Sequence, residues 1–249
     1  MTNLKRTNLI TLLVIFTLII GCEKDDAMTS NCIKGEGTVT TQTLSISEFN
    51  GVNLAFSSNV TIKKGATQEV KATGHPNIID KISTQVSNSF WEIYLDNGCY
   101  VDYELSIEIT VPDINRLEIS GSGNINVNSF INQNDLDITL IGSGNMTLND
   151  FEGISTLDIT LSGSGNFSAN SDITSLSTVI LNNSGSGTYS GFAISSTDFT
   201  VNSTGSGNCK ITAISTLNAT LSGSGDVSNK GTPNITQNIT GSGSLIDAN

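Results

Sequence analysis

Apolar and polar residues alternate in short segments that recur through the second half of the chain. Residues 136–140, 157–161 and 217–221 each carry an apolar side chain at every second position. This period of two is typical of strands with one buried face, whereas helices have a period of about 3.6. We therefore expect the recurring segments to be β-strands.

A Gly-Ser-Gly motif separates these segments at a nearly fixed spacing. Its first residue lies at Gly121, Gly142, Gly163, Gly185, Gly205, Gly223 and Gly241. A repeat of about 18–22 residues predicts a solenoid in which each coil stacks on the previous one.

Four positions are apolar in nearly every copy when the copies are aligned on the first glycine. They lie six, four and two residues before it and four residues after it. In the copy at Gly142 they are Leu136, Ile138, Leu140 and Met146. We expect these four columns to point inward, and intervening residues such as Thr139 and Thr160 to face water. The expected fold is an all-β, parallel β-helix.

Each Gly-Ser-Gly motif must turn a corner that superposes on the corners of neighbouring coils. Glycine permits positive φ, and Ser and Asn side chains bond nearby backbone groups. Stacking would form one ladder of serines and one of asparagines, including Ser122, Ser143, Ser164 and Ser206, and Asn124, Asn145, Asn166 and Asn208. These ladders are either corner architecture, which turn chemistry explains, or a polar binding stripe.

The region before the regular copies has a looser form of the same pattern. Residues 56–59 (FSSN) take the place of Gly-Ser-Gly-Asn, which predicts a degenerate coil. A helical turn is expected at residues 76–82, and strand-like segments follow. Because solenoid ends need covering, we interpret this region as a cap. The predicted single domain spans 35–249, with the degenerate coil and capping strands at 35–112 and regular coils at 113–249.

The first 21 residues have the features of a secretory signal. Lys5 and Arg6 precede a short apolar run, and the small residue Gly21 precedes Cys22. The run is short for a transmembrane helix. The junction resembles a bacterial lipoprotein signal, which implies that residues 1–21 are removed and that Cys22 is acylated.

An acidic tether at residues 22–34 follows the predicted lipidation site. Lys24, Asp25 and Asp26 resemble the export signal of surface lipoproteins in Bacteroidota, although an ordinary soluble tether has a similar composition. We expect a lipid-anchored protein of the outer membrane that faces the cell surface, with the periplasmic face as the alternative.

Charge limits the classes of partner. The chain has 11 basic and 23 acidic residues, for a net charge of −12 at pH 7. Such a surface repels nucleic acid and anionic lipid. We therefore expect no nucleic-acid partner, and membrane contact through the lipid on Cys22.

The other three cysteines have structural interpretations. Exported proteins form disulfides, and Cys32 and Cys99 are the candidate pair. Cys209 falls in an inward column and is expected to be a buried free thiol.

Three segments carry a resemblance to a known family. They are GVNL with NVTI at residues 51–62, NIIDKI at 77–82, and ITVPDINRLEISGSGNI at 109–125. Together they resemble the head GIN domain family from about Glu48 to the end of the chain. The resemblance implies a right-handed β-helix and a role as an auto-transporter adhesin. It supplies no catalytic residues.

An enzyme is a further interpretation, because some β-helices cleave acidic polysaccharides with calcium-binding carboxylates and a basic residue. Asp137 and Asp158 fall in one outward column of adjacent coils, about 5 Å apart, and could share a calcium ion. Arg116 occupies that column in the preceding coil, so two solvated carboxylates beside an arginine are the simpler interpretation. His75, the single histidine, lies in GHPN and is expected in a turn. We expect no catalysis, no metal and no cofactor.

The sequence thus favours a binding scaffold or adhesin with a carbohydrate or protein ligand. An envelope accessory or sensor protein that contacts another membrane protein is one alternative, and a polysaccharide-active enzyme is the other. No cap is evident for the last coil, so a homo-oligomer that covers it is a further expectation.

Overall fold

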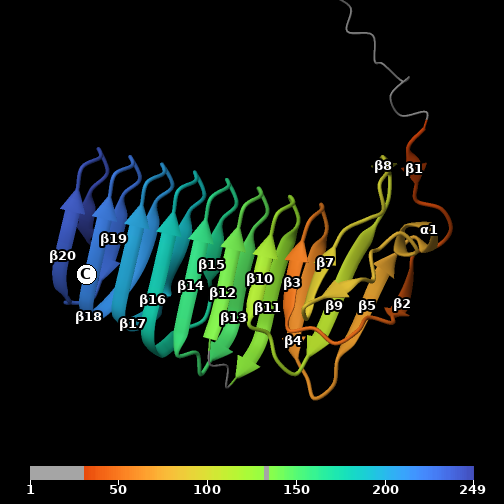
Figure 1. The fold of residues 1–249 in the computed structure, drawn as a ribbon, viewed down its shortest axis with the longest axis horizontal. Coiled ribbons are helices and arrows are strands. Elements are labelled where there is room, and N and C mark those ends of the chain that lie inside the picture. The colour runs from red at the N-terminus through yellow and green to blue at the C-terminus, as the bar shows by residue number, and fades with distance from the viewer. Residues whose placement is uncertain (1–30, 132–134) are drawn as a thin grey trace, which may run out of the picture.

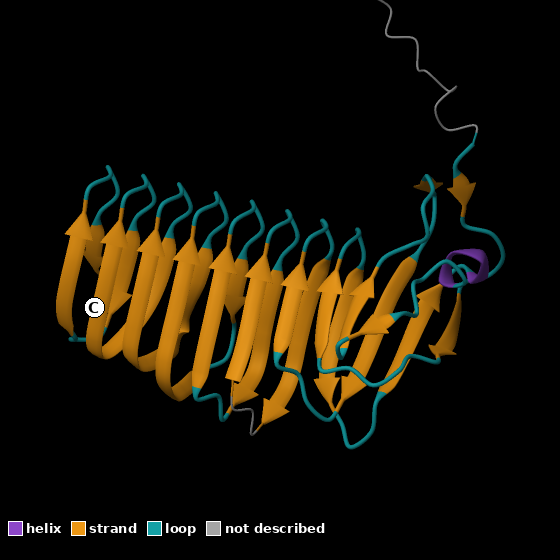
Figure 2. Cartoon of the chain, in the orientation of Figure 1, coloured by secondary structure: helices purple, strands orange, loops and turns teal. Residues whose placement is uncertain are grey.

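A computed structural model describes residues 31–131 and 135–249 (Figure 1). The fold is nearly all-β, and stacked parallel strands form a β-solenoid (Figure 2). The predicted fold class is confirmed. Cys22, Lys24, Asp25 and Asp26 lie outside the described residues, so the signal peptide and the lipid anchor stay predictions.

The strands form two faces joined by the Gly-Ser-Gly corners. In spatial order, the first face contains β7 (Phe90–Ile93), β3 (Gly51–Leu54), β10 (Arg116–Ile119), β12 (Asp135–Leu140), β14 (Thr156–Leu161), β16 (Ile173–Asn183) and, at the far end, β20 (Asn234–Ile239). The second face contains β9 (Leu105–Val111), β4 (Asn59–Lys64), β11 (Asn124–Ile131), β13 (Met146–Glu152), β15 (Phe167–Ala169) and, at the far end, β19 (Val227–Lys230) and β21 (Leu245–Asp247). Two long strands, β17 (Tyr189–Ser203) and β18 (Cys209–Leu221), bend from the second face to the first.

The apolar columns predicted from the sequence form the core. Leu117, Ile138, Ile159 and Leu181 are parallel partners in successive coils and are all buried. Burial of each such side chain contributes about 1.5–3 kcal/mol. One inward column changes from aromatic residues to smaller ones toward the C-terminal end of the solenoid. That column contains Phe167, Tyr189, Cys209 and Val227.

The degenerate coil predicted at residues 56–59 is present, but its position in the stack does not follow chain order. Strands β3 and β4 lie between β7 and β9 on one side and β10 and β11 on the other. After β4 the chain leaves the stack, builds the cap, and returns on the opposite side of β3 and β4. The backbone N–H of Gly123 donates to the carbonyl of Phe56 at 3.0 Å, across this junction.

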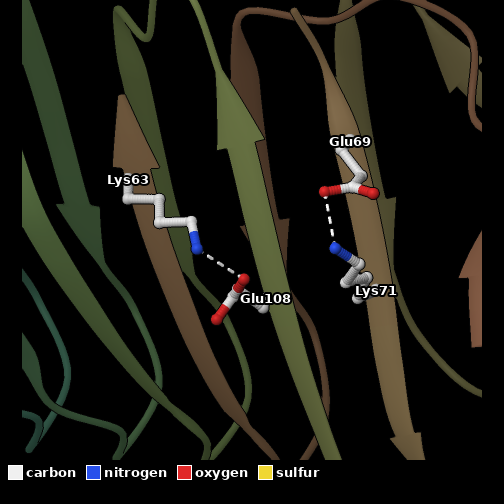
Figure 3. A network of polar contacts seen from close by, with 4 residues as sticks. All are labelled: Lys63, Glu69, Lys71 and Glu108. Atoms are coloured by element: carbon white, nitrogen blue, oxygen red, sulfur yellow. Dashed lines mark hydrogen bonds and ion pairs between the residues drawn. The ribbon is translucent and has the colours of Figure 1, made fainter. Parts of the chain in front are cut away.

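Antiparallel strands close the N-terminal end of the solenoid. Strand β5 (Glu69–Gly74) pairs with β9, β2 (Thr40–Leu44) pairs with β5, and β6 (Val86–Ser87) pairs with β7. Helix α1 (Pro76–Ile79) lies within the predicted helical turn. Figure 3 shows two ion pairs on this sheet, Lys63–Glu108 at 2.6 Å and Lys71–Glu69 at 2.7 Å.

The C-terminal end differs from the prediction for two of its apolar residues. Ile235 and Ile239 occupy inward columns, yet their exposed fractions are 50% and 40%, because no described strand covers β20. Two other inward positions of this coil carry Gln237 and Asp247, which pair with Ala219 and Asn229. The last coil therefore presents a partly polar surface, and the homo-oligomer stays a prediction.

Candidate binding surface

Close contact between coils explains the corner glycines. A Cβ added to Gly144 would overlap the carbonyl oxygen of Gly123, and one added to Gly142 would overlap that of Gly121. The expectation of positive φ at these corners is wrong. Among the described residues, the glycines with positive φ are Gly37, Gly153 and Gly231.

The first corner has no glycine because no matching corner lies against it. On the cap side of this corner, the chain between β7 and β9 leaves the stack, so no corner lies against Phe56 and Ser58 there. Phe56 packs against the core, and the Ser58 hydroxyl donates to the carbonyl of Leu105 at 3.0 Å. The departure from Gly-Ser-Gly therefore marks the junction between the cap and the regular coils.

The stacked corners form an open polar groove along the solenoid. It has a volume of about 470 Å³. Hydroxyl groups line it in two columns on either side of the glycines, namely Ser162, Ser184 and Thr204, and Ser164, Ser186, Ser206 and Ser224. The Ser206 hydroxyl lies 3.3 Å from that of Ser186. From Ser164 to Ser224, the predicted serine ladder is therefore an exposed wall of this groove.

The predicted asparagine ladder is bonded from coil to coil. Asn124 Oδ1 accepts hydrogen bonds from the backbone N–H of Asn145 at 3.1 Å and from its Nδ2 at 2.9 Å. Asn145 Oδ1 accepts the same two bonds from Asn166, at 3.2 and 2.9 Å. Asn208 Oδ1 accepts from the backbone N–H of Asp226 at 2.9 Å. Each of these side chains thus satisfies a backbone group of the next coil, which supports the architectural interpretation.

Replacing Asn145 by alanine removes bonds to both neighbouring coils. We expect the free energy of unfolding to fall by about 1–2 kcal/mol, because the N–H of Asn166 loses its side-chain acceptor at a partly solvated corner. Urea denaturation measures this change. Asn126, an outward residue on the same face, is the matched control for an Asn-to-Ala change, and an equal loss there would contradict a special role for the ladder.

The structure contains a second asparagine ladder, which was not predicted from the sequence. Asn149 Nδ2 donates to Asn128 Oδ1, and Asn170 Nδ2 donates to Asn149 Oδ1, each at 3.0 Å. The signal was available, since asparagine lies seven residues after the first glycine in three consecutive copies. This ladder lies toward the end of the second-face strands that is farther from the Gly-Ser-Gly corners.

The first face presents a regular outward column of polar residues. Thr139 pairs with Thr160, and Thr160 pairs with Asn182 in the next coil. Asn202 Nδ2 then donates to Asn182 Oδ1 at 2.9 Å. Hydroxyl and amide groups both donate and accept hydrogen bonds, so this column can bind polar ligands of several kinds.

The two aspartates considered as a cation site do lie side by side. Asp137 pairs with Asp158 in adjacent strands, and Arg116 pairs with Asp137 on the other side. The guanidinium of Arg116 instead bonds Glu118 at 3.1 Å. The described residues contain no group of three or more His, Cys, Asp and Glu that could hold a metal ion.

Partial burial, and then the nearby Asp137 carboxylate, raise the pKa of Asp158 above its ordinary value. A group with a raised folded-state pKa binds more protons when folded, so stability falls as pH rises from the unfolded-state pKa through the raised one. We expect Asp158→Asn to have a higher Tm than the wild type at pH values above both of these pKa values, and the same Tm at pH values below both. Melting curves between about pH 3 and 7 test this. Asp198→Asn is the control. Plots of Tm against pH that run parallel for the wild type and Asp158→Asn would contradict the prediction.

His75 and Cys209 have structural environments. His75 is the N-cap residue of α1, and its Nδ1 accepts a hydrogen bond from the backbone N–H of Glu104 at 3.0 Å. Cys209 is a buried free cysteine, and burial raises the pKa of its thiol. Asn183 Nδ2 lies 3.4 Å from the Cys209 Sγ. The geometry thus places His75 at the start of α1 and Cys209 in the core.

Cys32 and Cys99 form a disulfide in the structure, with their Cα atoms 4.5 Å apart. It adjoins a short parallel pair, β1 (Ile33–Lys34) and β8 (Tyr100–Val101), in which the Ile33 N–H donates to the Cys99 carbonyl at 2.7 Å. Lys34 and Asp102 add an ion pair at 3.5 Å. The start of the described chain is thus tied to the cap.

The fold and these surfaces define a parallel β-solenoid with bonded polar ladders at its corners and a polar outward face. The family model described as "Putative auto-transporter adhesin, head GIN domain" matches residues 48–233. The chain belongs to this family, as the sequence resemblance indicated. A comparison with curated proteins finds no match.

Several solved structures have a similar fold. A "putative adhesin" from Bacteroides fragilis has a TM-score of 0.78 and 20% identity, covering 86% of this chain and 98% of its own. A "putative lipid binding protein" from Parabacteroides distasonis has a TM-score of 0.72 and 21% identity, covering 87% and 100%. A "putative adhesin" from the same species has a TM-score of 0.66 and 19% identity, covering 86% and 99%. At these identities the likeness shows the fold.

Proposed function

We propose that the chain is a lipid-anchored adhesin that is displayed on the cell surface and binds carbohydrate or protein without catalysis. The observation that carries the proposal is the regular polar column on the first face, which includes Thr139, Thr160, Asn182 and Asn202. The in-register backbone holds these side chains at the strand spacing of about 4.8 Å. Family membership supports the same function.

Lipid anchoring is the proposed means of membrane attachment. The described residues contain no helix that is long and apolar enough to cross a membrane. The Gly21-Cys22 junction, which resembles a bacterial lipoprotein signal, supports the lipid anchor, and the acidic residues after it support export to the cell surface. The net charge of −12 supports a partner that is neither nucleic acid nor an anionic bilayer.

Replacing Thr139 and Thr160 together by alanine removes both hydroxyls and should weaken ligand retention about tenfold. Each lost hydrogen bond to a ligand is worth about 0.5–1.5 kcal/mol, and about 1.4 kcal/mol changes affinity tenfold. The assay is binding of the purified chain to arrays of neutral polysaccharides and extracellular proteins. Thr61→Ala with Thr147→Ala, on the second face, is the matched control.

The outcome separates this face from the rest of the surface. Loss in the Thr139/Thr160 variant alone, with an unchanged melting curve, supports the proposal. Equal binding by both double variants to every ligand retained by the wild type would refute the proposal that the first face is the binding surface.

A further inference from the structure

The disulfide joins two points that are far apart along the chain but meet at the capped end. Cys32 and Cys99 have a sequence separation of 67. The loop that they close contains strands β1 to β7 and helix α1. Figure 1 shows β1 and β8 together at this end, beyond the two faces. Any tension on the chain before Cys32 must therefore enter the fold at this point.

Without the disulfide, tension from the N-terminal side would follow the backbone into weakly held strands. Strand β1 is held to β8 through two residue pairs. Strand β2 comes next and, among the described strands, pairs only with β5, through five residue pairs. None of the five residues of β2 is fully buried. Because its pairs can break one after another from Thr40, β2 would peel away at low force.

With the disulfide, tension passes from Cys32 directly to Cys99 and then into β9. This strand is paired with β4 on one side and β5 on the other, through six residue pairs each. Its inward residues Ile107, Ile109 and Val111 are buried. Displacing β9 therefore requires disruption of two ladders and the core at once, whereas β2 carries no tension.

We propose that the Cys32–Cys99 disulfide is a mechanical clamp that routes tension past the edge strand β2 into the doubly paired strand β9. The clamp would protect the cap while the regular coils hold a ligand. Its physiological role rests on the proposed anchor and adhesion, but its mechanics depend only on the covalent connection and the strand order.

Single-molecule stretching of the chain from residue 23 to residue 249 tests the clamp. In Cys32→Ser/Cys99→Ser we expect a low-force event that releases the segment before β3, preceding the main unfolding events. The oxidised wild type should lack this event. Its fully stretched length should also be shorter by about 220–240 Å, since 67 residues at about 3.3–3.6 Å each stay inside the disulfide loop.

The controls separate the clamp from general loss of stability. Reduction of wild-type molecules should produce the early event, whereas Cys209→Ser should stretch like the oxidised wild type. An early low-force release in the oxidised wild type, or its absence from both the double variant and the reduced wild type, would overturn the proposal.

A cell-based assay distinguishes failure of the clamp from failure of the proposed function. Cells displaying the double variant should bind a ligand-coated surface as well as wild-type cells at rest, but detach several-fold more under flow. Equal detachment would refute the clamp in cells. If wild-type cells do not adhere to any surface tested, the adhesin proposal fails, while the stretching result still decides the clamp.

Discussion

Replacing Gly144 by alanine is expected to lower the free energy of unfolding by about 3 kcal/mol. The added Cβ would overlap the carbonyl oxygen of Gly123 and come within 2.8 Å of the Ile119 side chain. The carbonyl belongs to the backbone of the adjacent coil, so relief requires separation of the two coils. That separation would also strain the bond from the Gly144 N–H to the Gly121 carbonyl, which is 3.3 Å long.

Urea denaturation followed by the fluorescence of Trp91, the single tryptophan, measures the effect. Ser143→Ala is the control, because the Ser143 side chain is exposed and its loss should change stability by about 0.5 kcal/mol or less. Similar stabilities of Gly144→Ala and the wild type would show that the corners are looser than the structure indicates.

Replacing Trp91 by alanine is expected to cost about 3–5 kcal/mol. The ring is fully buried where β7 begins the solenoid, and its centroid lies 5.3 Å from that of Phe49. Its Nε1 donates to the carbonyl of Ser83 at 2.9 Å, which ties the first face to the segment after α1. Truncation would leave a cavity at the junction of the cap and the coils.

Thermal unfolding by circular dichroism measures the loss, since the variant has no tryptophan. Trp91→Phe keeps most of the ring volume and removes the bond to Ser83, so it should cost about 1–2 kcal/mol. A Trp91→Ala variant as stable as Trp91→Phe would contradict the view that the ring fills the cap.

Much of the fold was predictable because the repeat samples the same environment many times. Residues at the Ile138 and Ile159 positions are apolar in copy after copy, so the inward columns could be identified without any single copy being decisive. The degenerate coil was predictable from residues 56–59, which take the place of the repeated motif. The structure adds that Val52 and Leu54, just before them, are buried.

The remaining features depend on contacts that a repeat pattern does not encode. The need for Gly144 comes from the backbone of the next coil, whereas turn propensity suggested positive φ. The pattern also treated Ile235 like its equivalents, although the lack of a covering strand leaves it exposed. The placement of β3 between β7 and β10 follows from long-range pairing alone.

The polar surface was predicted more completely than its purpose. The asparagine ladder at Asn124 and Asn145 followed from stacking, and the structure gives its side chains bonds to the backbone of the next coil. The ladder at Asn128 and Asn149 lies away from the Gly-Ser-Gly motif and was not predicted. Neither ladder identifies a ligand, because its bonds join parts of the same chain.

Surface labelling of intact cells that express the full chain tests the central claim, display outside the cell, most directly. A membrane-impermeant antibody against the regular coils should label wild-type cells. Changing Lys24, Asp25 and Asp26 to alanine should abolish labelling while the protein stays in the membrane fraction, and Cys22→Ala should release it from that fraction. Wild-type protein that is labelled only after the outer membrane is permeabilised would contradict the account and indicate a periplasmic role.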